Sequence, residues 1–277
     1  MAIIGISGKI RSGKDTVGKI IQYLEAEKRD KDRNGKGLVP FIDALKTWDS
    51  DERHSERIYN EQHIHNFSTF HIKKFGSSLK DIVCIITGCT REDLESQEFK
   101  EKELGREWWT YNKFDSGTSA KPKFTTRPCY VTEEVLEELG ENRINKPTYR
   151  WLLQNIGTEC GRNIIGENVW INALFSKYKD NYTSNNQVRG FGEWTRPKWI
   201  ITDVRFPNEL KAIKDRKGIT IRVERDYVLR GEENPNNQHS SETALDSVEF
   251  QYTIINDGTI EELVEKVKEI LIKENII

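Results

Sequence analysis

One stretch near the N-terminus constrains the fold more than any other part of the chain: Gly8 to Thr16, with the sequence G-K-I-R-S-G-K-D-T. It follows an apolar run, residues 2–6, and precedes residues with helical periodicity. In a strand–loop–helix of this kind, the backbone N–H groups of the loop and the N-terminus of the helix attract a bound anion. Gly8 and Gly13 allow backbone conformations and a close approach that a Cβ atom would obstruct. The pattern G-x-x-x-x-G-K in this context is that of the P-loop, which binds nucleotide phosphates.

The position after Lys14 departs from the usual P-loop. Lys14 itself is placed to reach the β- and γ-phosphates of a nucleotide. The next residue is normally Ser or Thr, whose hydroxyl contacts Mg²⁺, but this chain has Asp15 there, followed by Thr16. We therefore predict that Asp15 or Thr16 holds the metal, and the sequence leaves both open. A glycine-rich turn with no ligand is the alternative, and the coincidence of strand, loop and helix argues against it.

Composition limits the class of protein and its partners. The chain has 277 residues, 35% apolar and 32% charged, which fits one large α/β domain or two small ones. The net charge of -2 provides no global basic field, so we expect no direct binding to a nucleic-acid polymer. Four dispersed cysteines without a C-x-x-C pair indicate reduced thiols. No signal peptide and no apolar run near the roughly 20 residues of a membrane span are evident, so we expect a cytoplasmic protein with no membrane partner.

Short apolar strands alternate with helices along the chain, which predicts a mainly parallel sheet of about five strands with helices on both faces. We expect the helix after the P-loop to end near Glu27 and the charged segment 28–37 to be an exposed loop, as we do for the polar segment 180–193. The strands are expected at residues 2–6, 69–75, 199–203, 219–223 and 252–256, with a final helix capped by Thr259.

The apolar strand 199–203 ends in a carboxylate, Asp203, as a Walker B strand does. Ligands of open α/β sheets bind outside the carboxyl ends of the strands. We therefore expect Asp203 and Lys14 to meet at the same edge of the sheet. The alternative is that Asp203 only caps neighbouring backbone groups.

Five segments in order resemble the bacteriophage-type deoxynucleoside monophosphate kinases: G-K-I-R-S-G-K-D-T, L-L-Q-N-I-G-T-E-C-G-R with V-W-I-N-A-L-F, I-T-D-V-R-F-P-N-E, H-S-S-E and I-I-N-D-G-T-I-E-E-L. The resemblance covers residues 1–24, about 69–95 and 147–272. It leaves 40–68 and 105–143 as insertions in a single kinase domain, 1–277. The K-D-T sequence is similar to that of these kinases and of phosphomevalonate kinases, so Asp15 agrees with the resemblance.

This resemblance implies a three-layer P-loop NTPase fold and phosphoryl transfer from ATP, with Mg²⁺, to a deoxynucleoside monophosphate (dNMP). The catalytic residues it implies are Lys14, Asp203 and Arg205. The donor site would comprise Gly8, Arg11, Ser12, Gly13, Lys14, Asp15, Thr16, Asn256 and Gly258. The acceptor would be bound by helices within 147–175, through Arg150, Gln154, Arg162 and Trp170, and by Lys80 from an earlier segment. A lid, 224–246, would contribute Arg225, Arg230 and His239.

Each of these arginines has a simpler interpretation as a member of a surface ion pair. Two other functions also stay open. One is a P-loop kinase for another phosphorylated small molecule, of the dephospho-CoA or phosphomevalonate type, and the other is a regulatory protein that binds a nucleotide. A homodimer is the commonest arrangement if the protein is oligomeric.

Overall fold

The computed structural model describes ten segments of the chain: residues 3–34, 68–111, 114–115, 123–124, 129–140, 143–179, 181–184, 192–195, 197–225 and 243–277. The chain divides into two compact units, the first within residues 1–77 and 170–277 and the second within 78–169. The expectation of a single kinase domain stays a prediction. No helix within these segments is both long and apolar enough to span a membrane.

The first unit contains a five-stranded sheet in the order β11-β10-β1-β9-β2, and every neighbouring pair is parallel. This confirms the predicted α/β fold with a parallel sheet. The strands are β1 (Ile3–Ser7), β2 (Phe70–Lys73), β9 (Lys198–Val204), β10 (Ile219–Glu224) and β11 (Tyr252–Ile255). The helices with them are α1 (Lys14–Asn34), α8 (Val169–Phe175), α9 (Pro207–Lys214) and α11 (Ile260–Lys273).

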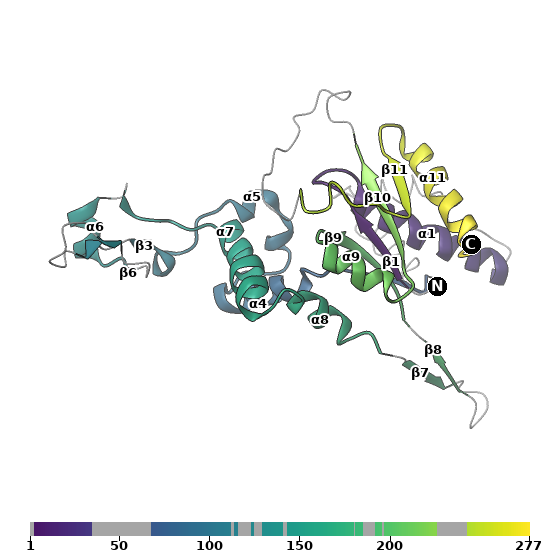
Figure 1. Ribbon diagram of the computed structural model, residues 1–277, viewed down its shortest axis with the longest axis horizontal. Coiled ribbons are helices and arrows are strands. Elements are labelled where there is room, and N and C mark those ends of the chain that lie inside the picture. The colour runs from purple at the N-terminus through teal and green to yellow at the C-terminus, as the bar shows by residue number, and fades with distance from the viewer. Residues whose placement is uncertain are drawn as a thin grey trace. The chain divides into compact units, whose positions relative to one another are not determined.

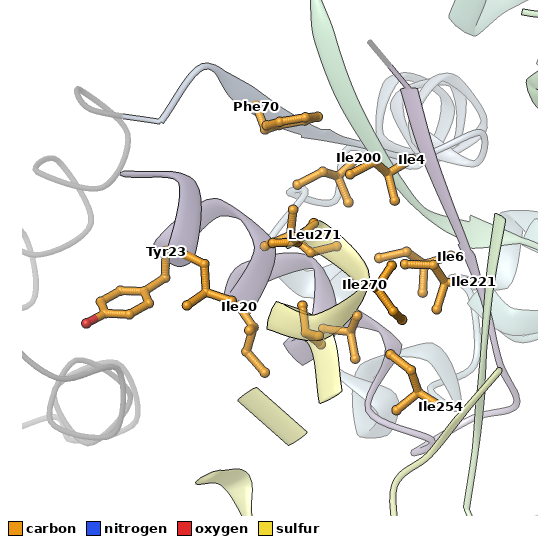
Figure 2. Close-up of a cluster of buried hydrophobic side chains, with 14 of the residues drawn as sticks. Ile4, Ile6, Ile20, Tyr23, Phe70, Ile200, Ile221, Ile254, Ile270 and Leu271 are labelled. Carbon is orange, nitrogen blue, oxygen red and sulfur yellow. The ribbon is translucent and has the colours of Figure 1, made fainter. Parts of the chain in front are cut away.

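Helices cover both faces of this sheet (Figure 1). Side chains alternate between the faces along a strand, and Ile4 and Ile6 of β1 join the cluster formed with α1 and α11. Figure 2 shows this cluster, where Ile20 of α1 and Leu271 of α11 lie among the isoleucines of the strands. On the other face, β1 approaches α9 so closely that a Cβ atom on Gly5 would lie 2.5 Å from Ile213 Cδ1.

Helix α1 is longer than we predicted. It continues past Glu27 to Asn34, so residues 28–34 of the charged segment that we expected to be a loop are helical. Lys and Arg are good helix formers, and ion pairs one turn apart support this part of the helix: Lys31 Nζ lies 2.8 Å from Glu27 Oε1, and Arg29 Nη1 lies 3.6 Å from Glu25 Oε1. The charge run therefore belongs to the exposed end of a helix.

The second unit is built mainly from short helices. These are α4 (Ser77–Thr87, which begins at the last residue of the first unit), η1 (Asp93–Glu95), α5 (Gln97–Lys100), η2 (Arg106–Trp108), α6 (Glu133–Leu139), α7 (Tyr149–Gln154) and η4 (Asn155–Ile165). Two short antiparallel pairs accompany them, β3 (Thr110–Tyr111) with β6 (Cys129–Tyr130) and β4 (Phe114–Asp115) with β5 (Lys123–Phe124). The unit has its own core, in which Val83, Leu94, Leu104 and Leu152 are buried.

Two segments have features that we did not predict. The segment 155–165, within the region where we expected helices, forms a π-helix, and Gly166 N–H donates to Gly161 C=O, five residues back, at 2.9 Å. Such wide turns are rare and occur often at functional sites. The segment 180–193, which we expected to be a loop, includes an antiparallel pair, β7 (Asn181–Ser184) with β8 (Gly192–Thr195).

Candidate active site

The P-loop connects β1 to α1 and is closely packed. A Cβ atom on Gly8 would lie 2.7 Å from the carbonyl oxygen of Val223 and would also collide with the Ser12 side chain. Gly13 has φ +94°, and a Cβ atom there would collide with the Asn256 amide. Arg11 also has a positive φ, 64°, which is uncommon for a residue with a side chain. Both glycines are therefore required by the geometry of the loop.

Two residues distant in sequence contact the backbone of this loop. Asn256 Nδ2 donates to Ser12 C=O at 2.8 Å, and Arg225 Nη1 donates to Arg11 C=O at 3.1 Å. The structure thus brings together predicted donor-site residues from the P-loop and the turn after β11, together with the predicted lid residue Arg225. The other predicted lid residues, Arg230 and His239, lie outside the described residues, as does nearly all of the 40–68 insertion.

Ser12 has a buried side chain whose hydroxyl lacks a hydrogen-bond partner among the described residues. Buried polar groups are nearly always hydrogen-bonded, so we expect a ligand or a bound water at this hydroxyl. Ser12 lines a cavity of about 440 Å³ whose charged lining residues are three cations, Lys9, Arg222 and Arg225, and two carboxylates, Glu224 and Asp246. Asp246 pairs with both Lys9 and Arg222, so these cations would have to exchange a carboxylate partner for the phosphates of a nucleotide. Lys14 Nζ lies 3.4 Å from Lys9 C=O, so its ammonium group also stays beside the loop.

Asp15, the second residue of α1, accepts a hydrogen bond from Thr202 Oγ1 at 2.7 Å and lies 3.2 Å from Lys74 Nζ. Partial burial favours a higher pKa for the Asp15 carboxyl, but Lys74, Thr202 and Lys14 together lower the pKa below its ordinary value. Asp15 therefore carries a negative charge at neutral pH. Mg²⁺ binds oxygen atoms, commonly one or two carboxylates with phosphate oxygens and waters. The Asp15 carboxylate and the neighbouring Thr16 hydroxyl fit that chemistry.

Asp203 lies at the carboxyl edge of the sheet, near the end of β9, as we expected of a Walker B residue. Its two carboxylate oxygens accept hydrogen bonds from Phe75 N–H at 2.7 Å and Gly76 N–H at 2.9 Å. Burial raises its pKa, and these two N–H groups and the Arg205 charge offset part of that effect. In this structure Asp203 fixes the turn that follows β2.

Arg205 follows β9, and its backbone N–H donates to Glu209 Oε2 at 2.7 Å. The same oxygen accepts from Phe206 N–H at 3.1 Å, so the buried Glu209 side chain holds the start of α9. This carboxylate was absent from our sequence prediction. It fixes the backbone from which the Arg205 side chain projects.

The predicted acceptor residues Lys80, Arg150 and Arg162 lie in the second unit, where each contacts another residue of that unit. Lys80 Nζ lies 2.5 Å from Glu95 Oε1. Arg150 pairs with Glu101 and donates to Gln97 Oε1 at 2.8 Å. Arg162, on the π-helix, donates to Glu167 C=O at 3.2 Å. Each of the three cationic groups thus has its own partner within this unit.

The remaining acceptor candidates differ in exposure. Gln154 is half-buried at the end of α7. Trp170 is buried in α8, with only 6% of its surface exposed. Gly258, predicted for the donor site, lies in the turn after β11 beside Glu262. The acceptor roles stay predictions.

Two residues of this region were missed by the sequence analysis, Thr202 and Lys74. Each occupies the carboxyl end of a parallel strand or the position just after it, which is where ligands of such sheets bind. That placement was the available signal, because Thr202 immediately precedes the predicted Asp203 and Lys74 follows β2.

The five parallel strands in this order, with a glycine-bracketed loop after the first and helices on both faces, define an α/β protein with the P-loop kinase fold. A family model described as "Deoxynucleotide monophosphate kinase" matches residues 109–267, more than half of the chain, and the chain belongs to this family.

Two curated proteins are similar over parts of the chain. One is "Uncharacterized protein ORF77" of Ictalurid herpesvirus 1 (strain Auburn), 32% identical over 153 residues that make up 53% of this chain and 52% of the relative. The other is the "Deoxynucleotide monophosphate kinase" of Escherichia phage RB69, 25% identical over 138 residues, or 50% of each chain. The aligned part thus spans about half the length of the curated relatives that the chain matches.

Proposed function

We propose that this protein is an ATP-dependent dNMP kinase, which transfers the γ-phosphoryl group of ATP to the phosphate of a dNMP and forms ADP and a dNDP. The observation that carries the proposal is that a chain of the deoxynucleotide monophosphate kinase family has a P-loop with an orphaned buried hydroxyl, Ser12. Phosphoryl transfer requires little covalent participation by the protein. Positioning and charge stabilisation supply most of the catalysis.

On this proposal the P-loop binds the donor phosphates. The backbone N–H groups of 8–13 and the N-terminus of α1 face the phosphate oxygens, and Lys14 neutralises the charge that develops on the transferred group. Mg²⁺, held by Asp15 or Thr16, would neutralise the donor phosphates when bound. Asn256 and Arg225 contact the loop backbone and so limit its movement.

The predicted acceptor residues Arg150 and Arg162 would bind the phosphate of the dNMP. A guanidinium group suits this task because it binds phosphate with two parallel hydrogen bonds. Arg150 and Arg162 would have to exchange their present contacts with Glu101 and Glu167 for the substrate. The exposed Arg150–Glu101 ion pair contributes only about 0–1 kcal/mol. The hydrogen bond from Arg162 to the Glu167 carbonyl contributes about 0.5–1.5 kcal/mol, so the exchange costs little.

The test is ADP release from Mg-ATP in the presence of each dNMP, measured with a coupled assay. We expect stimulation by one or more dNMPs and loss of at least about 100-fold of that activity in Lys14→Ala, because this lysine stabilises transition-state charge. Lys31→Ala, on the exposed end of the same helix, is the matched control and should retain full activity. Absence of stimulation by every dNMP with folded protein would refute the proposal.

The same assay separates the other functions. Turnover with dephospho-CoA or phosphomevalonate alone would identify a different acceptor, and nucleotide binding with no acceptor-dependent turnover would favour a regulatory role. Formation of deoxynucleotides for DNA synthesis would place the protein in the cytoplasm, that of the host if a phage encodes it. If the protein is oligomeric, we propose a homodimer, because two-fold dimers are the commonest oligomers.

A further inference from the structure

The Thr202 side chain is fully buried on β9 and is held against the start of α1. Its Oγ1 donates to Asp15 Oδ1 at 2.7 Å. One turn along α1, Gly18 packs directly on the same residue, and a Cβ atom on Gly18 would lie 2.7 Å from Thr202 Cγ2. Because the methyl group packs at Gly18, the hydroxyl is directed at Asp15. The contact is therefore fixed by packing as well as by the hydrogen bond.

A lysine from a third segment reaches the same carboxylate oxygen. Lys74 follows β2, and its Nζ lies 3.2 Å from Asp15 Oδ1. The Asp15 side chain nevertheless stays about half exposed, at 54%. Both contacts involve one oxygen atom, so they orient the carboxylate while the group stays accessible from outside.

Asp203, the residue after Thr202, has a different set of partners. The pairing of β9 with β1 shifts register between Ile201 and Val204, so the strand is irregular at these two residues. Thr202 contacts α1, whereas the Asp203 carboxylate accepts hydrogen bonds from the backbone of Phe75 and Gly76. Of these two neighbouring residues, Thr202 is the one that hydrogen-bonds the start of the P-loop helix.

This pairing reverses the usual chemistry of a P-loop. In common P-loop proteins the loop supplies a Ser or Thr hydroxyl and the neighbouring strand supplies the carboxylate, and both serve Mg²⁺. Here α1 supplies the carboxylate, Asp15, and β9 supplies the hydroxyl, Thr202. The hydroxyl and the carboxylate are in contact here, with the hydroxyl on the strand and the carboxylate on the helix.

We propose that Thr202 is a positioning residue for Mg-nucleotide binding, whose buried hydroxyl holds the Asp15 carboxylate in the role that a P-loop hydroxyl normally fills. Asp203 then serves the turn after β2 instead of the metal side of the site. The inference rests on the proposed use of Mg-ATP. The inference assigns the Mg²⁺ to Asp15 instead of Thr16. It also adds Thr202, which acts only through Asp15.

The test measures the affinity of the full chain for a fluorescent ATP analogue, with Mg²⁺ and with excess EDTA. In Thr202→Val, which keeps the shape and removes the hydroxyl, we expect the affinity gained from Mg²⁺ to fall about tenfold, as for loss of a hydrogen bond to a charged group. The affinity in EDTA should stay unchanged. Thr202→Ser, which keeps the hydroxyl, should retain most of the gain.

Two further variants separate positioning from general destabilisation. Thr220→Val is the matched control: Thr220 is buried on β10 and accepts a hydrogen bond from Gln251 N–H at 3.2 Å, away from Asp15. It should lose stability and keep the Mg²⁺ gain. In Asp15→Asn the gain should already be lost, and adding Thr202→Val should change it no further, because both substitutions act on one contact.

A normal Mg²⁺ gain in Thr202→Val or in Asp15→Asn would overturn the inference, as would a loss of similar size in Thr220→Val. Absence of any Mg²⁺ gain in the wild-type protein would also overturn it. Failure of the proposed kinase function has a different signature, since wild-type protein would then bind Mg-ATP with the expected gain and phosphorylate no dNMP.

Discussion

Asn256 is joined to Ser12, 244 residues earlier, by a hydrogen bond of 2.8 Å from its side-chain amide to the Ser12 carbonyl oxygen. The contact connects the turn after β11, the last strand of the sheet, to the loop after β1, the central strand. It holds in place the loop residue whose hydroxyl lacks a partner among the described residues. The proposed donor site therefore depends on a residue from the opposite end of the chain.

Replacing Asn256 by Ala should weaken ATP binding about three- to tenfold, which corresponds to the loss of one hydrogen bond that preorganises the loop. Asn256→Asp should weaken it further, because the carboxylate cannot donate to Ser12 C=O and places negative charge near the phosphates. Isothermal titration with ATP measures both effects. Wild-type affinity in both variants would contradict the role of this contact.

Gly13→Ala should abolish most ATP binding and lower the free energy of unfolding by more than about 1–2 kcal/mol, the cost of a left-handed conformation. The additional loss comes from collision of the new Cβ atom with the Asn256 amide. Gly88→Ala is the matched control, since Gly88 has φ +76° with no heavy atom within 4 Å of the Cβ position. It should show the conformational cost alone, in urea unfolding, and normal ATP affinity.

Asp203→Asn should lower the free energy of unfolding by about 1–3 kcal/mol, because the new amide NH₂ group would face one of two backbone N–H donors. The neutral amide avoids the cost of burying a charged carboxylate, which is the effect that raises the Asp203 pKa, and this offsets part of the loss. Asp215→Asn, which disrupts only an exposed ion pair with Lys211, should change stability by less than about 1 kcal/mol. Equal stability of Asp203→Asn and the wild type would show that the turn after β2 does not depend on this carboxylate.

Tyr252 should make stability depend on pH in the alkaline range. Its Oη donates to Glu274 Oε1 at 2.5 Å, and this hydrogen bond, with burial and the Glu274 charge, raises the Tyr252 pKa. The stabilisation is complete below the unfolded pKa of about 10 and is lost as the pH rises through the higher folded pKa.

Tyr252→Phe lacks this stabilisation at every pH. The difference in unfolding free energy between wild type and Tyr252→Phe should therefore be positive at pH 8 and should shrink above about pH 10. Chemical unfolding at several pH values measures it. A difference that grows with alkaline pH would contradict the assignment.

Contiguous patterns predicted the sheet well. The strands at 199–203 and 219–223 are short segments rich in β-branched and aromatic residues, which favour strands, and the structure places them beside β1. The predicted end of α1, near Glu27, was wrong because we interpreted the charge of residues 28–34 as a sign of a loop. Ion pairs one turn apart support a helix there. The π-helix at 155–165 has no comparable local signal, since its hydrogen bonds shift by one residue without a change in residue type.

The sequence by itself determined the P-loop and its place between a strand and a helix. The conformation of such a loop depends on residues within it, above all Gly8 and Gly13, and on the apolar run before it. Only the tertiary structure decided the partners of Asp15 and Asp203. Thr202 lies 187 residues from Asp15, and Phe75 lies 128 residues from Asp203. Those contacts arise because parallel strands distant in sequence end at one edge of the sheet, and the face to which each side chain points then selects its partner.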